Sequence, residues 1–97
     1  MKQPLTIGFI GLGLIGGSIA KAIRYYYPDT RIIAHTRSQA TIDYALNEQI
    51  IDIACDQVDA RFSECDYIFL CAPVEANASY LEILKSLIQP GCILTDV

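Results

Sequence analysis

The sequence predicts a doubly wound α/β domain built on a parallel sheet with strand order 3-2-1-4-5. Three observations lead to this prediction. Short apolar runs alternate with stretches whose apolar residues recur at helical spacing, as in strands joined by crossover helices. A glycine-rich turn at residues 11–16 joins the first apolar run to the first helical stretch. The run at residues 66–72 shows no polar alternation, which indicates a strand buried on both faces of a parallel sheet.

The first half of the chain contains two strand–helix units. Residues 5–10 are too short an apolar run for a helix and predict a strand. A helix at residues 14–27 follows and ends before Pro28, because proline disfavours helical geometry in the preceding residue. We expect its inward stripe to comprise Ile15, Ile19, Ala22, Ile23 and Tyr26, with one ring of Tyr25, Tyr26 and Tyr27 packed in the core. Residues 31–35 predict the second strand.

The next unit begins with Ser38, a good N-cap for a helix that ends near Asn47. Its expected inward residues are Ile42, Ala45 and Leu46. Residues 50–55 predict a short third strand, and residues 60–63 one helical turn.

The last unit contains the fourth strand at residues 66–72, broken by Pro73, and a helix at residues 75–88. The expected inward residues of this helix are Tyr80, Leu81, Leu84, Leu87 and Ile88. Pro90 and Gly91 turn the chain into a fifth strand at residues 92–96. Right-handed crossovers favour the order 3-2-1-4-5. The usual dinucleotide fold has a sixth strand, so we expect a domain truncated after strand five.

Composition excludes several classes of protein. The chain has 97 residues, enough for one domain, and its 53% hydrophobic and 19% charged residues exclude intrinsic disorder. No apolar stretch reaches the ~18 residues of a membrane span and no signal peptide is visible, so we expect a cytoplasmic protein without a membrane partner. The net charge is −4 and the basic residues are scattered, which argues against nucleic acid as a partner.

Cysteine spacing argues against a metal site. The four cysteines, Cys55, Cys65, Cys71 and Cys92, are irregularly spaced, and the chain has one histidine. No zinc site is therefore expected. We expect four reduced, mostly structural thiols, with Cys71 and Cys92 acting as small buried hydrophobes.

The glycine-rich turn has the form G-x-G-x-x-G and consists of Gly11, Leu12, Gly13, Leu14, Ile15 and Gly16. It directly follows a predicted strand and opens a predicted helix, the context of a Rossmann-like dinucleotide site. There the first glycine permits the tight turn, the second lets a pyrophosphate approach, and the third lets the helix pack on the strand. All six residues are candidate cofactor-binding residues. The alternative is a Gly-rich turn in another kind of α/β protein.

The end of the second strand bears on cofactor choice. Thr36 follows Gly16 by about 20 residues, where an NAD-preferring site places an acid for the ribose 2′-OH. Here Thr36, Arg37 and Ser38 supply hydroxyls and a guanidinium, which suits a 2′-phosphate, so we expect NADP to be preferred over NAD. The alternative is a solvated Arg37 and a site that tolerates either cofactor. His35 is expected near the adenine or ribose, or else is an ordinary strand-end residue.

The end of the fourth strand supplies three more candidates, Cys71, Ala72 and Pro73. They lie at the carboxyl edge, where ligands bind in open α/β sheets, and we expect them to line the nicotinamide-side ribose. The alternative for Pro73 alone is a proline that starts a helix.

Two stretches of the chain resemble the N-terminal part of prephenate and arogenate dehydrogenases. One is GFIGLGLIGGSIA at residues 8–20, which is more specific than the bare glycine pattern. The other is DYIFLCAPV at residues 66–74, followed after a helix by PGCILTDV at residues 90–97. The similarity spans the chain. It implies that residues 1–97 are an NAD(P)-binding Rossmann domain and that the family's helical dimerisation domain is absent.

The resemblance implies an oxidative decarboxylation of prephenate or arogenate, with hydride transfer to NAD(P)+. The family's general base, a histidine, and its helper serine lie beyond Val97. The resemblance therefore implies no catalytic residue in this chain, and His35 is not that base. The substrate and a homodimer formed through the absent domain belong to the full-length enzyme, and we expect the fragment to be inactive.

Two other functions remain open. One is another Rossmann dehydrogenase of the hydroxyacid or imine-reducing group, although those enzymes usually carry Asn-Met or Ala-Met where this chain has Leu14 and Ile15. The other is a non-catalytic NAD(P)-binding sensor or regulatory module.

Overall fold

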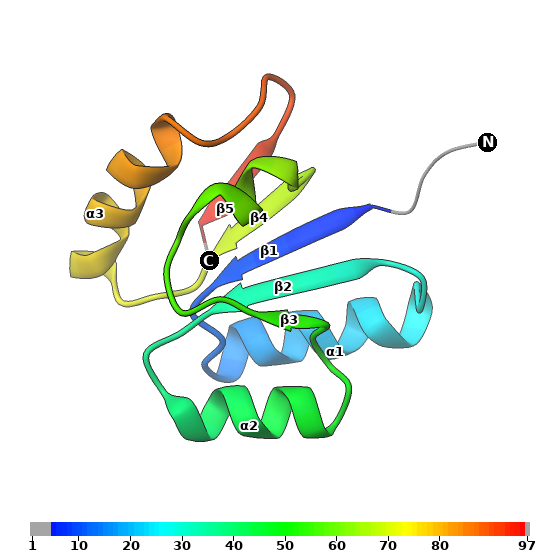
Figure 1. Ribbon diagram of the computed structural model, residues 1–97. Coiled ribbons are helices and arrows are strands. Elements are labelled where there is room, and N and C mark those ends of the chain that lie inside the picture. The colour runs from blue at the N-terminus through cyan, green and yellow to red at the C-terminus, as the bar shows by residue number, and fades with distance from the viewer. Residues whose placement is uncertain (1–4, 97) are drawn as a thin grey trace.

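The computed structural model describes residues 5–96 as a five-stranded sheet in the order β3-β2-β1-β4-β5, with every pairing between the described strands parallel (Figure 1). The strands are β1 (Thr6–Ile10), β2 (Arg31–His35), β3 (Ile53–Ala54), β4 (Tyr67–Leu70) and β5 (Ile93–Asp96). The predicted doubly wound parallel sheet and its strand order are confirmed. β3 is much shorter than the six residues expected, because the N–H groups of Ile50 and Ile51 donate to the Ala45 carbonyl oxygen at the end of α2 instead of to β2.

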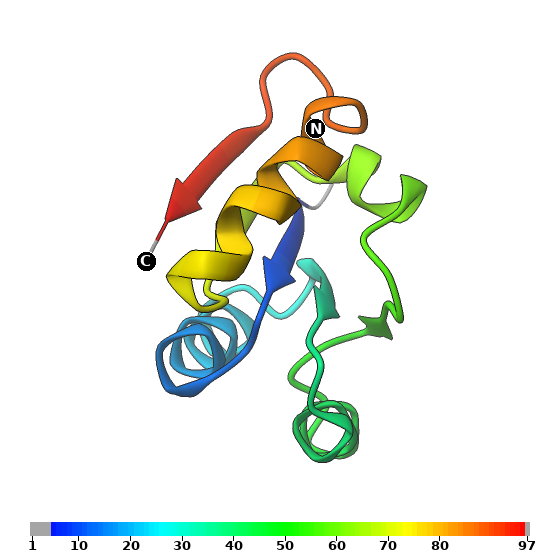
Figure 2. The same cartoon turned by 90° about the vertical axis from the view of Figure 1, so that its left-hand side faces the viewer.

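Helices cover both faces of this sheet. They are α1 (Leu14–Tyr26), α2 (Gln39–Asn47), the short 3-10 helix η1 (Ala60–Glu64) and α3 (Val74–Lys85). α1 and α2 lie on one face, and α3 crosses the other face, in front of the sheet in Figure 2. Ser38 caps α2 as predicted, since its side chain accepts a hydrogen bond from the Thr41 backbone N–H at 3.2 Å. None of the helices between residues 5 and 96 is long and apolar enough to cross a membrane.

Each face of the sheet has its own core. Under α1 and α2 lie Ile7, Phe9, Leu12, Ala20, Ile32, Ala34, Ile42, Ala45, Ile50 and Ile51. Under η1 and α3 lie Ile10, Ile33, Cys55, Phe62, Cys65, Ile68, Leu70 and Leu84. β4 contributes to both cores, as its lack of polar alternation predicted: Phe69 stacks on Phe9 with ring centroids 5.1 Å apart, while Ile68 faces the second core.

All four cysteines are free thiols. Cys55 and Cys65 are buried in the second core, whereas Cys71 and Cys92 are only half-buried. Burial raises the pKa of the Cys65 thiol to about 12 and also raises the pKa of Cys55. These two thiols are therefore neutral and serve as packing residues.

The buried face of α1 differs from the expected stripe. Gly16 and Ala20 are fully buried and Ile19 and Ile23 partly so, whereas Ile15, Ala22 and Tyr26 are exposed. The smallest side chains face the sheet because α1 packs close to it: a Cβ on Gly16 would lie 3.0 Å from the Gly11 carbonyl oxygen. Only small residues fit where α1 lies so close to the sheet. A prediction based on the spacing of apolar residues alone therefore misses them.

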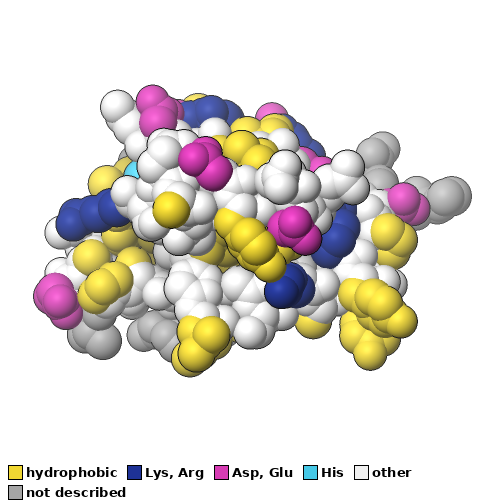
Figure 3. Space-filling view, turned by 90° about the horizontal axis from the view of Figure 1, so that it is seen from below, with side chains coloured by type: hydrophobic (Ala, Val, Ile, Leu, Met, Phe, Trp, Pro, Cys, Tyr) yellow, Lys and Arg dark blue, Asp and Glu magenta, His cyan; other side chains and the backbone are white. Residues whose placement is uncertain are grey.

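The prediction that one of three consecutive tyrosines packs in the core is wrong. Tyr25, Tyr26 and Tyr27 are 79%, 70% and 67% exposed. Arg24 instead turns inward at this end of α1, where it donates hydrogen bonds to the Pro28 and Thr30 carbonyl oxygens and pairs with Asp52 at 2.7 Å. Figure 3 shows apolar side chains exposed on this helical side of the molecule.

Two leucines also point outward against expectation. Leu46 of α2 and Leu81 of α3 are 41% and 38% exposed. The nine-residue α2 buries only Ile42 and Ala45, so its narrow contact leaves Leu46 in solvent. α3 faces the sheet through Asn77 and Leu84, and Leu81 lies beside that face. α3 ends at Lys85, and residues 87 and 88 continue in a turn whose N–H groups donate to the Leu84 carbonyl oxygen.

Candidate functional site

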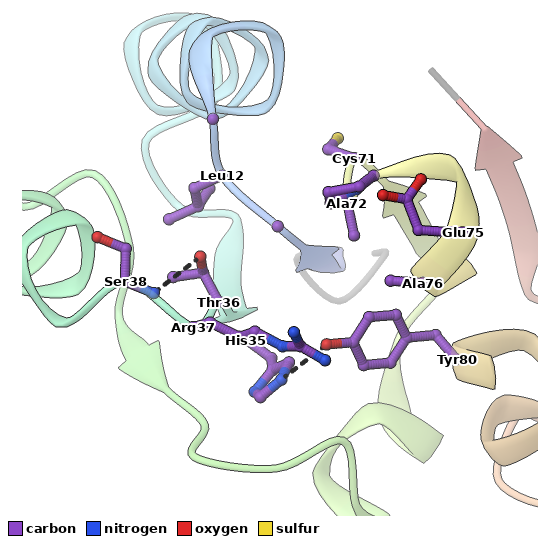
Figure 4. A pocket seen from close by; sticks show the side chains of 13 residues that line it. Leu12, His35, Thr36, Arg37, Ser38, Cys71, Ala72, Glu75, Ala76 and Tyr80 are labelled. Carbon is purple, nitrogen blue, oxygen red and sulfur yellow. Dashed lines mark hydrogen bonds between the residues drawn. The ribbon is translucent and has the colours of Figure 1, made fainter. Parts of the chain in front are cut away.

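A cleft of about 600 Å³ opens at the carboxyl edge of the sheet (Figure 4). The loops after β1, β2 and β4 line it, together with the first turns of α3. The lining residues are Gly11, Leu12, Gly13, His35, Thr36, Arg37, Ser38, Cys71, Ala72, Pro73, Glu75, Ala76 and Tyr80. The chain leaves β1 toward β2 on one side, whereas β4 pairs with the other side of β1. The cleft thus lies at the topological switch point, where open α/β sheets bind ligands.

The turn after β1 holds the centre of this cleft. The Gly11 N–H donates to the His35 carbonyl oxygen at 2.7 Å, and its φ of +87° is a conformation that favours glycine. A Cβ on Gly11 would lie 2.8 Å from the Ala72 nitrogen. Gly11 therefore lets the ends of β1, β2 and β4 come together.

The N-terminus of α1 opens toward the cleft. Gly13 is its N-cap, no side chain caps it, and no acidic residue stands in its first turn. A Cβ on Gly13 would meet no atom within 4 Å, so the backbone here is accessible. An open helix N-terminus with free N–H groups attracts anions, and the residues present fit a pyrophosphate.

Three predicted site residues do not line the cleft. The side chains of Leu14 and Ile15 are 89% and 60% exposed, and Gly16 is buried against Cys71. All three belong to the first turn of α1, which begins at Leu14. The other ten predicted residues are brought together by the structure.

The loop after β2 forms the second wall. Thr36 is half-buried, while Arg37 and Ser38 are exposed. The Ser38 N–H donates to Thr36 Oγ1 at 3.5 Å, and the Ser38 hydroxyl is engaged in capping α2. Within residues 5–96, Arg37 makes no ion pair. Its guanidinium is therefore available to an anionic group in the cleft.

His35, the residue before this loop, is held at both ring nitrogens. Nδ1 lies 3.0 Å from the Cys55 carbonyl oxygen, and Nε2 lies 3.4 Å from the Tyr80 hydroxyl. Neither ring nitrogen is free to take a proton from a substrate without breaking one of these contacts.

The loop after β4 and the start of α3 form the third wall. The Cys71 N–H donates to the Ile10 carbonyl oxygen at 2.8 Å, which ties this loop to β1. Glu75, Ala76 and Tyr80 also line the cleft, although sequence reasoning did not place them there. Ala76 and Tyr80 are four positions apart, so both lie on one face of a helix that begins at the carboxyl edge. This spacing is the feature of the sequence that could have indicated these two residues.

These features define a nucleotide-binding domain of the Rossmann-like class. The model of the prephenate dehydrogenase nucleotide-binding domain matches residues 19–97. The chain belongs to the prephenate dehydrogenase family, as its sequence resemblance implied.

Individual relatives agree with this assignment. The chain is 39% identical to the prephenate dehydrogenase of Bacillus subtilis over 95% of its own length and 25% of that protein. It superimposes on the crystal structure of Synechocystis arogenate dehydrogenase with a TM-score of 0.84 and 34% identity, over 96% of this chain and 32% of that one.

The fold also matches a prephenate dehydrogenase from A. aeolicus, solved in complex with hydroxyphenyl propionate and NAD+. The TM-score is 0.86 at 24% identity, over 98% of this chain and 34% of that one. This chain therefore spans about a quarter to a third of the length of each of these three proteins.

Proposed function

We propose that this chain binds NAD(P)+ in the cleft and forms the dinucleotide-binding part of an enzyme that oxidatively decarboxylates prephenate or arogenate. The observation that carries this proposal is the open N-terminus of α1 at the switch point, next to Gly13. The dinucleotide, when bound, accepts the hydride. The chain's own residues bind and orient it, which is the protein's main contribution in cofactor enzymes.

Each wall of the cleft has a role in this proposal. The first turn of α1 holds the pyrophosphate through backbone N–H groups. Thr36, Arg37 and Ser38 face the ribose of the adenosine half. Cys71 and Ala72 lie on the opposite side in the view of Figure 4, and together with Pro73 they face the ribose of the nicotinamide half.

NADP is the preferred cofactor in this proposal, and NAD is also accepted. Position 36 holds threonine, so no carboxylate is present to repel a 2′-phosphate, and Arg37 is exposed and unpaired among the described residues. A guanidinium binds phosphate with good geometry and charge. The complex of the A. aeolicus protein contains NAD+, which shows that this fold accommodates the dinucleotide in that relative.

The substrate side of the reaction lies outside residues 5–96 in this proposal. His35 is committed to Cys55 and Tyr80, which argues against its acting as the general base. The family resemblance assigns the base, the substrate contacts and a helical dimerisation domain to other parts of the full-length homodimeric enzyme. The 97-residue chain should therefore bind a dinucleotide without oxidising prephenate.

Calorimetric titration with NADP+ and NAD+ tests the binding, and an assay of NAD(P)H formation from prephenate and from arogenate tests the activity. We expect saturable binding and no turnover. A chain that binds neither dinucleotide would overturn the proposed function. Turnover by the chain alone would show that the base and substrate contacts have been wrongly assigned.

A further inference from the structure

Two rings from elements far apart in the sequence meet at one end of the cleft. His35 ends β2 and Tyr80 lies in α3, and their ring centroids are 5.7 Å apart at an interplanar angle of 71°. Figure 4 shows the Tyr80 side chain extending from α3 toward His35, with a dashed line marking the 3.4 Å contact between its hydroxyl and Nε2. Both residues line the cleft.

The direction of the hydrogen bonds follows from the chemistry of the partners. The Cys55 carbonyl oxygen only accepts, so His35 Nδ1 carries the hydrogen in their 3.0 Å contact. Nε2 of the neutral ring then has a lone pair and accepts from the Tyr80 hydroxyl. A relay from Tyr80 through His35 to Cys55 thus connects α3, β2 and the segment after β3.

Tyr80 lies between the second core and the cleft. Its ring is half-buried and contacts the second core, which fixes one side of it. Ala76 lies one helical turn earlier and also lines the cleft. The ring is therefore held on the core side by packing and at its hydroxyl by His35, and it borders the cleft.

We propose that Tyr80 is a dinucleotide-binding residue whose ring forms the wall against which the adenine lies, and that His35 positions this ring. The inference rests on the proposed function. With the pyrophosphate at α1 and the ribose at Thr36–Ser38, the base extends toward the end of the cleft that His35 and Tyr80 close. An aromatic face there stacks on a flat base and excludes water from it.

Probes with and without adenine distinguish the contribution of the Tyr80 ring to binding from the contribution of the rest of the site. We would measure dissociation constants of ADP-ribose and of nicotinamide mononucleotide for wild type, Tyr80→Leu, Tyr80→Phe and the control Tyr25→Leu. Tyr25 is exposed near the opposite end of α1 from the cleft. Tyr80→Leu should weaken ADP-ribose by about fivefold to 150-fold, as expected for loss of base stacking. Tyr80→Phe keeps the ring and should lose much less, and Tyr25→Leu should lose nothing.

Nicotinamide mononucleotide should bind equally to all four proteins, because it carries no adenine. Equal ADP-ribose affinity of wild type and Tyr80→Leu would overturn the role of Tyr80 and leave the proposed function intact. Wild type that binds neither ADP-ribose nor a dinucleotide would instead overturn the proposed function itself.

NMR of the wild type tests the inference without relying on a variant. The ring protons of Tyr80 should shift upfield on addition of ADP-ribose and stay in place with nicotinamide mononucleotide. His35 should show the tautomer protonated at Nδ1, and Tyr80→Phe should move the Nε2 resonance. No ring shift with bound ADP-ribose would overturn the stacking role, and a His35 protonated at Nε2 alone would overturn the relay.

Discussion

Gly11 at the end of β1 lies directly against the backbone of Ala72 at the end of β4. A Cβ on Gly11 would come within 2.8 Å of the Ala72 nitrogen and 2.9 Å of the Cys71 carbonyl carbon. Because backbone atoms cannot move aside as a flexible side chain does, this contact requires glycine. It also sets the distance between two of the walls of the cleft.

Replacing Gly11→Ala should lower the free energy of unfolding more than replacing Gly91→Ala. Both residues have a positive φ, +87° and +95°, which costs alanine about 1–2 kcal/mol. Only Gly11 also meets backbone, and relieving such overpacking typically costs a further ~1–3 kcal/mol. Urea unfolding of the two variants measures the difference, and equal destabilisation would show that the contact with Ala72 is unimportant.

Gly13→Ala should weaken dinucleotide binding through a direct clash with the ligand. A Cβ at this position meets no atom within 4 Å, so the substitution creates no clash within the protein. The methyl group would lie where the pyrophosphate approaches the backbone, and dinucleotide affinity should fall about tenfold or more. Calorimetry checks the affinity, with Gly91→Ala as the control outside the cleft. Unchanged affinity would place the phosphates elsewhere.

Arg37→Ala should weaken NADP+ and leave NAD+ nearly unchanged. A hydrogen bond to a charged group contributes about 1.5–3 kcal/mol, which corresponds to roughly tenfold to over a hundredfold in the dissociation constant. Added salt should reduce this contrast, because Arg37 is exposed. Lys85→Ala removes an equal charge far along α3 from the cleft and serves as the control. Equal loss of both cofactors would mean that Arg37 does not recognise the 2′-phosphate.

Thr36→Asp should reverse the cofactor preference. The new carboxylate would accept hydrogen bonds from the ribose hydroxyls of NAD+ and repel the 2′-phosphate of NADP+. The matched control is Thr36→Asn, which has a similar shape without the charge. The ratio of the two dissociation constants is the measurement, and an unchanged ratio in Thr36→Asp would place the ribose away from residue 36.

Asp59 should make stability depend on pH below about pH 4. Hydrogen bonds from Arg61 lower the pKa of this carboxyl to about 2 from an ordinary 3.8. A lowered pKa stabilises the folded protein above the ordinary value, and this contribution is lost as the pH falls toward 2. The stability difference between wild type and Asp59→Asn should therefore be constant above about pH 4 and shrink below it. A difference that stays constant down to pH 2 would contradict the prediction.

The amino-acid sequence by itself determined the order of elements and much of the cleft. Alternating apolar runs and helical stripes predict the parallel sheet, and right-handed crossovers then restrict the strand order. The position of Gly11, Gly13 and Gly16 between a strand and a helix predicts the anion site, because that backbone geometry is local. Ser38 was likewise predictable, since an N-cap involves residues only three apart.

Only the tertiary structure decided which side chains face which neighbours. Tyr25–Tyr27 share the apolar pattern of core residues, yet Arg24 takes the inward position because its guanidinium reaches Pro28, Thr30 and Asp52. Tyr80 has the helical spacing expected of a core residue. It lines the cleft because α3 lies next to the end of β2, where its hydroxyl contacts His35. The Tyr80–His35 contact joins residues 45 positions apart and the Arg24–Asp52 pair joins residues 28 positions apart, and no local periodicity encodes either.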